Sequence, residues 1–407
     1  MRLVLHIGME KTGTTSLQRT LRDERNYLKE AGILYPTSKH PPFDHQWLMC
    51  LLLEPDDLPR EFRTIRSLDH DAVRGFGARF WDELQNQVTE SRPQTVVLSY
   101  ESFFLLKREP LERLRDLLAS SFSDIEVIAY IRHPSTLWLS KAQQAVKGSE
   151  IITPPGLYRS NLRAHLTRHI DVFDGRVIAR AFDPETLHHG NVVRDFLSSY
   201  IPGGDDLAQS MTIASENESM SGEAMCVLQA FYRQFWPNQA GVFAIEGREL
   251  LAVLQMLRRD LHQQSPKLRP GVEAKIAENH EQDLKWLHER FGIAFPSWRG
   301  SISHSGAADP RALLSADLRD ILQVDPAAID RTILHALRQL AARSASPRSK
   351  APNRRARTGP ASAIGSEVVD ASELQPIRVR PATPASSSPS RLRRLVRHLQ
   401  PRRSRWP

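Results

Sequence analysis

The feature that most constrains the fold is an apolar segment that runs at once into a glycine loop and then a helical pattern. Residues 3–7 predict a short buried strand, and the loop that follows extends from Gly8 to Gly13. Leucines then recur at helical spacing through residues 14–31. A strand that turns through glycines into a helix is typical of an α/β domain built on a parallel sheet.

Strand and helix patterns continue to alternate. Three more apolar runs predict strands, at 95–100, 125–131 and 176–182. Each follows a helical pattern, at 71–90, 109–120 and 157–173. This alternation predicts a parallel sheet with helices on both faces. The segment between the first helix and the second, residues 33–70, is rich in Pro, Asp and His and is expected to be an irregular insertion.

Composition divides the chain into three parts. We expect an α/β core at 1–205, a helical extension packed on it at 206–342, and a Pro-, Ser- and Arg-rich disordered tail at 343–407. In the extension the clearest helical periodicity lies at 221–235, 247–263 and 272–290. The tail has 15 Lys and Arg against 3 Asp and Glu, an excess of +12, and residues 1–342 have a net charge of −4. The overall net charge of +8 is therefore due to the tail.

The tail suggests two interpretations. Its Arg- and Leu-rich stretch 391–400 has amphipathic spacing, which favours weak contact with an anionic membrane surface. The alternative is a solvated basic segment that binds nucleic acid loosely, and no specific nucleic-acid partner is expected.

Other sequence features narrow the protein class. Cys50 and Cys226 lie far apart without metal-ligand spacing, so we expect buried thiols and no metal site. The longest apolar run near the start, residues 47–53, is too short to span a membrane. No signal peptide precedes the glycine loop, and a cytoplasmic location is expected.

The glycine loop has the chemistry of a phosphate cradle. It offers Lys11 as a cation, backbone N–H groups at a helix start, and four hydroxyl groups, on Thr12, Thr14, Thr15 and Ser16. The frame is G-x-x-x-x-G, but Thr14 stands where nucleoside triphosphatases have lysine. A nucleotide kinase or another P-loop enzyme is therefore the weaker alternative, as is a glycine turn that binds nothing.

A second element follows the strand 125–131. This strand ends in Arg132-His133-Pro134, and Ser140 lies eight residues after Arg132. An arginine at the carboxyl end of a parallel strand and a serine two turns into the next helix are able to converge on one phosphate.

Both elements resemble those of the sulfotransferase superfamily. Residues 6–17, His-Ile-Gly-Met-Glu-Lys-Thr-Gly-Thr-Thr-Ser-Leu, are similar to its 5′-phosphosulfate loop, whose core is K-T-G-T-T-S/A-L. Arg132-x-Pro134 with Ser140 resembles its 3′-phosphate motif, and Glu101-Ser102-Phe103-Phe104 resembles a bacterial branch. The chain lacks a clear counterpart of the R-K-G segment that some members carry near the C-terminus.

The resemblance implies a P-loop-like sulfotransferase fold and 3′-phosphoadenosine 5′-phosphosulfate (PAPS) as co-substrate, without a metal. The acceptor would be a hydroxyl or amine of a glycan, lipid or small molecule; a non-catalytic nucleotide-binding protein of the same fold is a further alternative. By this resemblance the donor site would comprise Lys11, Thr12, Gly13, Thr14, Thr15, Ser16, Arg132 and Ser140.

Two residues are candidates for the general base, and Lys11 is the candidate for stabilising the leaving phosphate. Glu101 follows the strand 95–100 at the edge where parallel sheets build their active sites, and burial beside Phe103 and Phe104 would raise its pKa. The rival is His45, because histidine is suited to base catalysis near neutral pH.

Overall fold

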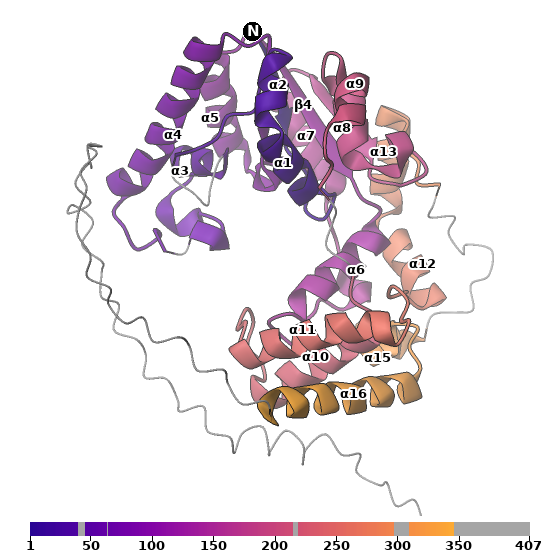
Figure 1. Cartoon of the computed structure of the whole chain (residues 1–407). Helices are drawn as coiled ribbons and strands as arrows, with labels where there is room; N and C mark the ends of the chain where they lie inside the picture. Colours follow the sequence, from indigo (N-terminus) through magenta and orange to yellow (C-terminus); the bar gives the residue numbers. More distant parts are fainter. Residues whose placement is uncertain (40–44, 63, 215–218, 297–308, 346–407) are drawn as a thin grey trace, which may run out of the picture. The chain divides into compact units, whose positions relative to one another are not determined.

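The structure is a computed structural model that describes residues 1–39, 45–62, 64–214, 219–296 and 309–345 (Figure 1). The described residues up to 332 form one compact unit, and residues 333–345 belong to another. Most of the predicted tail, residues 346–407 with the stretch 391–400, lies outside the described residues. The division of residues 1–342 into a core and a helical extension stays a prediction.

The centre of the first unit is a five-stranded parallel sheet with the strand order β2-β3-β1-β4-β5. The strands are β1 (Arg2–His6), β2 (Ile33–Leu34), β3 (Thr95–Ser99), β4 (Asp124–Ile131) and β5 (Val177–Ala181). Leu3, Val4 and Leu5 of the central strand are fully buried, as expected when helices cover both faces. The predicted α/β fold with a parallel sheet is confirmed.

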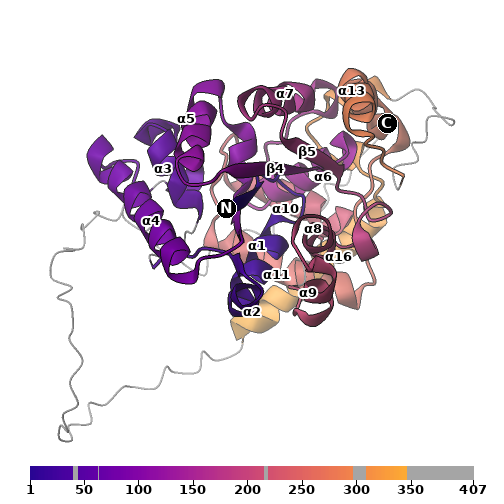
Figure 2. The same ribbon diagram turned by 90° about the horizontal axis from the view of Figure 1, so that it is seen from above.

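Helices flank this sheet on both sides, and others follow it in the chain. The helices of the described residues are α1 (Thr14–Asp23), α2 (Arg25–Glu30), α3 (Met49–Leu52), α4 (His70–Ser91), α5 (Arg108–Ala119), α6 (Pro134–Ala145), α7 (Leu162–Val172), α8 (Val192–Tyr200), α9 (Gly204–Ser210), α10 (Gly222–Phe235), α11 (Ile245–Asp260), α12 (Pro270–Glu278), α13 (Glu281–Phe291), α14 (Pro310–Leu314), α15 (Leu318–Ile321) and α16 (Pro326–Ala345). Short 3-10 helices are η1 (His45–Leu48), η2 (Pro55–Asp57), η3 (Arg60–Phe62), η4 (Glu101–Leu105), η5 (Pro155–Leu157) and η6 (His188–Gly190). Figure 2 shows α5 and α7 on one side of the sheet and α1 and α8 on the other, and each pair is in contact.

The strand register determines which loop residues lie side by side at the carboxyl ends of the strands. His6 is level with Ser99 of β3, so the segments that follow β1 and β3 begin side by side. His6 is also level with Ile128 of β4, and β4 continues to Ile131. At about 3.3 Å per residue, the longer β4 raises Arg132 roughly 13 Å above the end of β1. This extension brings Arg132 to the height of the loop that follows β1.

The insertion at 33–70 is more regular than the sequence predicts. Ile33 and Leu34 form β2, which pairs with β3 and extends the sheet at one edge. Gly32 permits this because its φ of 75° turns the chain, and its carbonyl accepts a hydrogen bond from the N–H of Gln94 (2.9 Å). The short elements η1, α3, η2 and η3 occupy much of the rest.

Two predicted helices have different boundaries. The helix expected at 157–173 begins only at Leu162, because prolines and Gly156 precede it and Asn161 has a left-handed φ of 51°. The helix expected at 272–290 is two helices, α12 and α13, that meet at His280.

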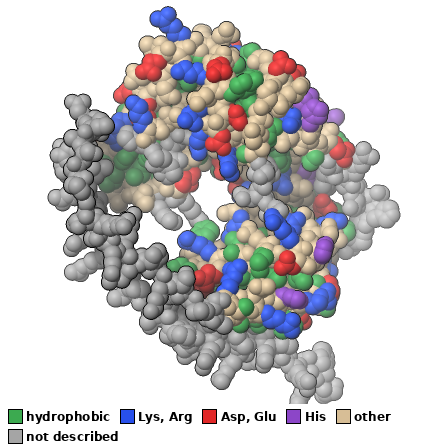
Figure 3. Space-filling model, in the orientation of Figure 1, with side chains coloured by type: hydrophobic (Ala, Val, Ile, Leu, Met, Phe, Trp, Pro, Cys, Tyr) green, Lys and Arg blue, Asp and Glu red, His purple; other side chains and the backbone are tan. Residues whose placement is uncertain are grey.

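No helix within the described ranges is both long and apolar enough to cross a membrane. On the face shown in Figure 3, Lys and Arg side chains are interspersed with Asp and Glu. That mixture agrees with the nearly balanced charge of the chain before the tail.

Candidate functional site

The loop between β1 and α1 has the backbone that a phosphate cradle requires. Gly8 and Gly13 have φ values of 63° and 73°, and Lys11 between them has a φ of 67°, which is unusual for a residue with a side chain. Gly13 caps α1 without any side-chain hydrogen bond, so no side chain caps the helix start there. The helix start and the loop therefore present N–H groups to an anion.

Gly8 is also where the loop meets the segment after β3. A Cβ atom at this position would lie 2.9 Å from Cα of Glu101 and 3.4 Å from Oγ1 of Thr14. Only glycine fits there, since real Cβ contacts are essentially never this short. The close approach places the Glu101 backbone directly against the loop.

The loop hydroxyls fall into different roles. The Thr12 hydroxyl is buried and donates to the carbonyl of Met9 (2.6 Å), so it closes the loop. The Thr14 hydroxyl is buried and has no hydrogen-bond partner among the described residues, although it is near enough to Glu101 to lower the pKa of that carboxyl group slightly. Ser16 is buried in the first turn of α1, whereas Thr15 is exposed.

Arg132 joins β4 to the tip of the loop. Its Nη1 donates to the carbonyl of Lys11 (2.7 Å), and its Nε donates to Oγ1 of Thr136 (3.2 Å). The guanidinium also lies over the ring of Phe182, 5.6 Å from its centroid. The structure thus brings together the two elements that the sequence proposes as phosphate sites. Ser140, half-buried, lies two turns into α6 on the same helical row as Thr136.

A second contact fastens the loop to α6. Nζ of Lys141 forms an ion pair with Oε1 of Glu10 (2.5 Å). Glu10 and Lys11 are neighbours, so two consecutive loop residues are held from the β4–α6 side. Sequence reasoning missed Lys141 and Glu10; the position of Lys141 directly after Ser140 was the available signal.

Glu101 is the first residue of η4, on the opposite side of the loop. Burial raises the pKa of its carboxyl group, and the Lys11 ammonium opposes that shift. The charges of Glu10 and Glu61 raise this pKa further. Glu101 is therefore a partly desolvated carboxylate within electrostatic reach of Lys11, a suitable environment for a general base.

His45 occupies a different environment. It is 1% exposed, its Nδ1 accepts from the N–H of Ser99 (2.9 Å), and its Nε2 donates to the carbonyl of Pro36 (2.8 Å). Because both ring nitrogens are engaged by backbone, His45 braces the end of β3 in this structure. Of the two candidate bases, Glu101 is the one beside the loop.

Lys147, just after α6, is a further cation that sequence reasoning missed. Burial and the nearby charge of Lys11 lower the pKa of its ammonium group, which donates to Oε1 of Gln144 (3.2 Å). No motif marks this residue, and only the fold brings it near Lys11. Within the described residues, no group of three or more His, Cys, Asp and Glu side chains is arranged to hold a metal ion.

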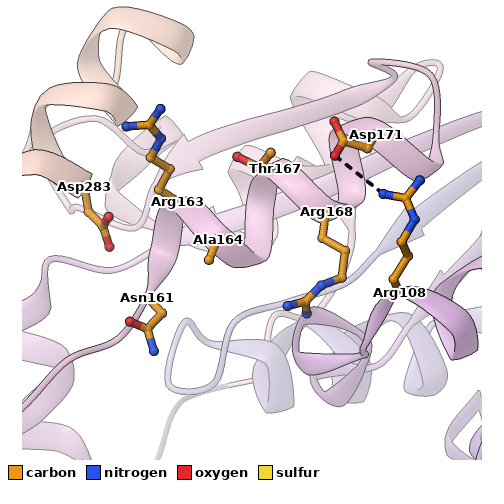
Figure 4. A pocket seen from close by; sticks show the side chains of 8 residues that line it. All are labelled: Arg108, Asn161, Arg163, Ala164, Thr167, Arg168, Asp171 and Asp283. Atoms are coloured by element: carbon orange, nitrogen blue, oxygen red, sulfur yellow. Dashed lines mark ion pairs between the residues drawn. The ribbon is translucent and has the colours of Figure 1, made fainter.

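A groove of about 460 Å³ runs along α7, away from these residues (Figure 4). It is lined by Arg108, Asn161, Arg163, Ala164, Thr167, Arg168, Asp171 and Asp283. Arg108 lies 3.8 Å from the carboxylate of Asp171, and Arg168 donates to the carbonyl of Leu106 (2.6 Å). The third arginine, Arg163, lies over the ring of Trp286, 5.8 Å from its centroid. The groove shares no residue with the phosphate loop, and all three of its arginines already have protein partners, so we assign it no part in the site.

Comparison with known proteins gives structural neighbours only. No family model matches the chain, and no curated protein matches it. Among solved structures, a sulfotransferase from Alicyclobacillus acidocaldarius is 13% identical with a TM-score of 0.34, covering 73% of this chain and 98% of its own. The sulfotransferase domain of the Synechococcus PCC 7002 olefin synthase is 14% identical with a TM-score of 0.29, covering 57% and 94%. A sulfotransferase domain from the curacin biosynthetic pathway is 12% identical with a TM-score of 0.24, covering 69% and 97%. These likenesses are distant, and the function is inferred from the site itself.

Proposed function

We propose that the chain is a sulfotransferase that takes a sulfuryl group from PAPS and transfers it to a hydroxyl or amine of an acceptor. The observation that carries this proposal is the hydrogen bond between Arg132 and the carbonyl of Lys11. It joins a phosphate loop and an Arg/Ser element into one site suited to a nucleotide with phosphates at both ends.

In this proposal the donor is held by the loop and by the β4 side. The N–H groups at the start of α1 and the Lys11 ammonium receive the 5′-phosphosulfate, and Arg132 with Ser140 receives the 3′-phosphate. The Lys11 side chain then stabilises the charge that develops on the leaving phosphate. Its left-handed backbone, anchored by Arg132 at the carbonyl, orients this side chain from the loop tip.

The acceptor is activated from the other side of the loop. The Glu101 carboxylate takes the proton of the attacking hydroxyl or amine as the bond to sulfur forms. Burial makes this carboxylate more basic than one in water, while Lys11 keeps it ionised. Sulfuryl transfer needs the attacking acceptor atom and the leaving phosphate oxygen in line on opposite sides of the sulfur atom. Glu101 follows β3, and Lys11 lies in the loop after β1, the neighbouring strand.

Two measurements test the proposal. Isothermal titration calorimetry should detect binding of adenosine 3′,5′-bisphosphate, and radiosulfate-labelled PAPS should label an acceptor in cell extract. Magnesium-dependent turnover of ATP without sulfate transfer would show a kinase-like enzyme instead. Binding of the bisphosphate without transfer to any acceptor would show a non-catalytic nucleotide-binding protein.

A further inference from the structure

Three buried polar atoms cluster beside the phosphate loop without a use in the mechanism above. They are the Tyr158 hydroxyl, the Ser160 hydroxyl and Nδ1 of His165, and none has a hydrogen-bond partner among the described residues. A buried polar atom left unpaired costs about 1–3 kcal/mol, so such atoms are few in folded proteins. Tyr158 and Ser160 are two positions apart, and Tyr158 and His165 both neighbour Lys141, so the three atoms point to a site whose hydrogen bonds are completed from outside the protein.

The cluster lies close to the proposed reaction centre. The Lys141 ammonium, which pairs with Glu10 of the loop, is 5.8 Å from the centroid of the Tyr158 ring. The His165 ring lies 5.3 Å from that of Phe104, which belongs to η4 together with Glu101. The cluster therefore borders both the loop and the segment that carries the candidate base.

The segment 151–161, which carries two of the three atoms, is fastened by its backbone. Trp138 Nε1 donates to the carbonyl of Thr153 (2.9 Å), and the Asn279 amide donates to that of Gly156 (3.1 Å). The N–H of Ser160 donates to Nε2 of His280 (2.9 Å). Since its backbone is held from α6 and from the residues after α12, the segment positions its Tyr and Ser side chains for another role.

The hydroxyl groups of Tyr158 and Ser160 carry no charge near neutral pH. The Lys141 cation is balanced by Glu10, 2.5 Å away. Burial and the nearby cations Arg168 and Lys141 lower the pKa of His165, which favours the neutral imidazole. His280 accepts from Ser160 and donates to the carbonyl of Ile276 (2.7 Å), which also describes a neutral ring. The cluster therefore offers hydroxyls, a neutral imidazole nitrogen and two aromatic rings.

We propose that Tyr158, Ser160 and His165, with the Phe104 ring, form the binding subsite for a neutral, hydroxylated acceptor such as a sugar ring or a polyol. This inference rests on the proposed function. The hydroxyl groups of a neutral ligand form hydrogen bonds with all three unpaired atoms, and the C–H groups of the ligand pack on the aromatic rings. Of the two cations beside His165, Lys141 is already paired with Glu10, and Arg168 donates to the carbonyl of Leu106. Because the three atoms are shielded from solvent, a ligand reaches them once the Tyr158 ring or the segment around it shifts.

Ligand-observed NMR with methyl β-galactoside, methyl α-mannoside, myo-inositol and glucuronate tests the subsite directly, without nucleotide. We expect at least one neutral probe to bind and glucuronate to bind more weakly. Tyr158→Phe, which removes only the hydroxyl, and His165→Ala should each weaken that binding roughly fivefold or more, the scale of one hydrogen bond. Tyr27→Phe, at a partly exposed tyrosine of α2, is the matched control and should bind like the wild type.

The outcomes separate this inference from the proposed function. Calorimetry with adenosine 3′,5′-bisphosphate should give the same affinity for the wild type and both variants, which also shows that the variants are folded. The subsite is overturned if no neutral probe binds, if both variants bind it like the wild type, or if glucuronate binds as tightly. Failure of the wild type to bind the bisphosphate would instead count against the sulfotransferase proposal, whatever the sugar result.

Discussion

The two sides of the phosphate loop differ in charge. On the β4 side, Arg132 and Lys141 hold the loop at two consecutive residues. On the β3 side lie carboxyl groups, those of Glu101 and of Glu61, which accepts from the hydroxyl of Tyr100. One edge of one sheet thus has a cationic side suited to phosphates and an acidic side suited to proton abstraction. The difference shows how a parallel sheet places two opposite chemistries on either side of a central strand.

The largest expected effect concerns the acidic side. Glu101→Gln should lower kcat by about 10²–10⁴-fold, the usual contribution of a general base, and leave the affinity for adenosine 3′,5′-bisphosphate unchanged. Radiosulfate transfer and calorimetry measure the two quantities, with the exposed Glu249→Gln as control. Normal turnover in Glu101→Gln together with an inactive His45→Ala variant would assign the role of base to His45.

The pH dependence of kcat tests the same residue. A base acts only when deprotonated, and burial raises the pKa of Glu101 above its ordinary value of 4.5. We therefore expect kcat of the wild type to fall as the pH drops through that raised pKa. The residual rate of Glu101→Gln should lack this step, and an identical step in both proteins would mean that another group titrates.

On the cationic side, Arg132→Ala should weaken binding of adenosine 3′,5′-bisphosphate by about 2–5 kcal/mol, as expected for truncating a buried charge partner. Arg132 also holds the Lys11 carbonyl, so part of this loss should extend to AMP, which lacks the 3′-phosphate. The loss for AMP should be the smaller one in calorimetry. Equal losses for both ligands would show that Arg132 only fastens the loop.

At the loop itself, Lys11→Ala should lower turnover by about 10²–10³-fold, the scale for losing one charge stabiliser. Lys11→Gly should lose as much activity but be more stable than Lys11→Ala by about 1 kcal/mol, because glycine accepts the φ of 67° without strain. Radiosulfate transfer and urea unfolding measure these effects. Near-normal turnover in either folded variant would remove Lys11 from the reaction.

The contact between the loop and the acidic side predicts a stability difference. Gly8→Ala and Gly175→Ala both place a Cβ at a positive φ, 63° and 78°, at a cost of about 1 kcal/mol each. Only at Gly8 does the new atom also overlap Glu101, which should add about 1–3 kcal/mol. The difference between the two variants in the free energy of unfolding, measured with urea, gives the cost of the overlap with Glu101. Equal losses would mean that Glu101 moves away at little cost.

The smallest expected effect is a pH dependence of stability that comes from two buried histidines, His6 beside β3 and His133 after β4. Burial lowers the pKa of His6, which bonds to Ser99 of β3, and of His133, at the start of α6, to about 3. The unfolded chain, with an ordinary pKa of 6.5, binds protons first, so this stability is full above pH 6.5 and lost toward pH 3. Each histidine should lower the free energy of unfolding by roughly 0.5–1 kcal/mol between pH 7 and pH 6. Urea unfolding at both values measures it, and no change would show that the rings take up protons alike in the folded and unfolded chain.

The sequence by itself determined the features that are encoded within a few neighbouring residues. The four longer strands, the parallel alternation and the loop from Gly8 to Ser16 all follow from local periodicity and from chemistry contained in one short segment. The place of Arg132 at the carboxyl end of its strand was also anticipated, whereas its hydrogen bond to the loop was not.

The tertiary structure decided what depends on residues far apart in the chain. His45 is adjacent to Ser99, 54 positions away, and only that contact turns a candidate base into a buried brace. The β2 pairing, the Glu10–Lys141 bond and the approach of Tyr158 to the loop also join distant segments. Sequence patterns record the preference of a residue for its own helix or strand, whereas burial and partners are set by which segments fold against it. For that reason the phosphate loop and Glu101 were readable from the sequence, whereas Glu61, the surroundings of His45 and the proposed subsite were not.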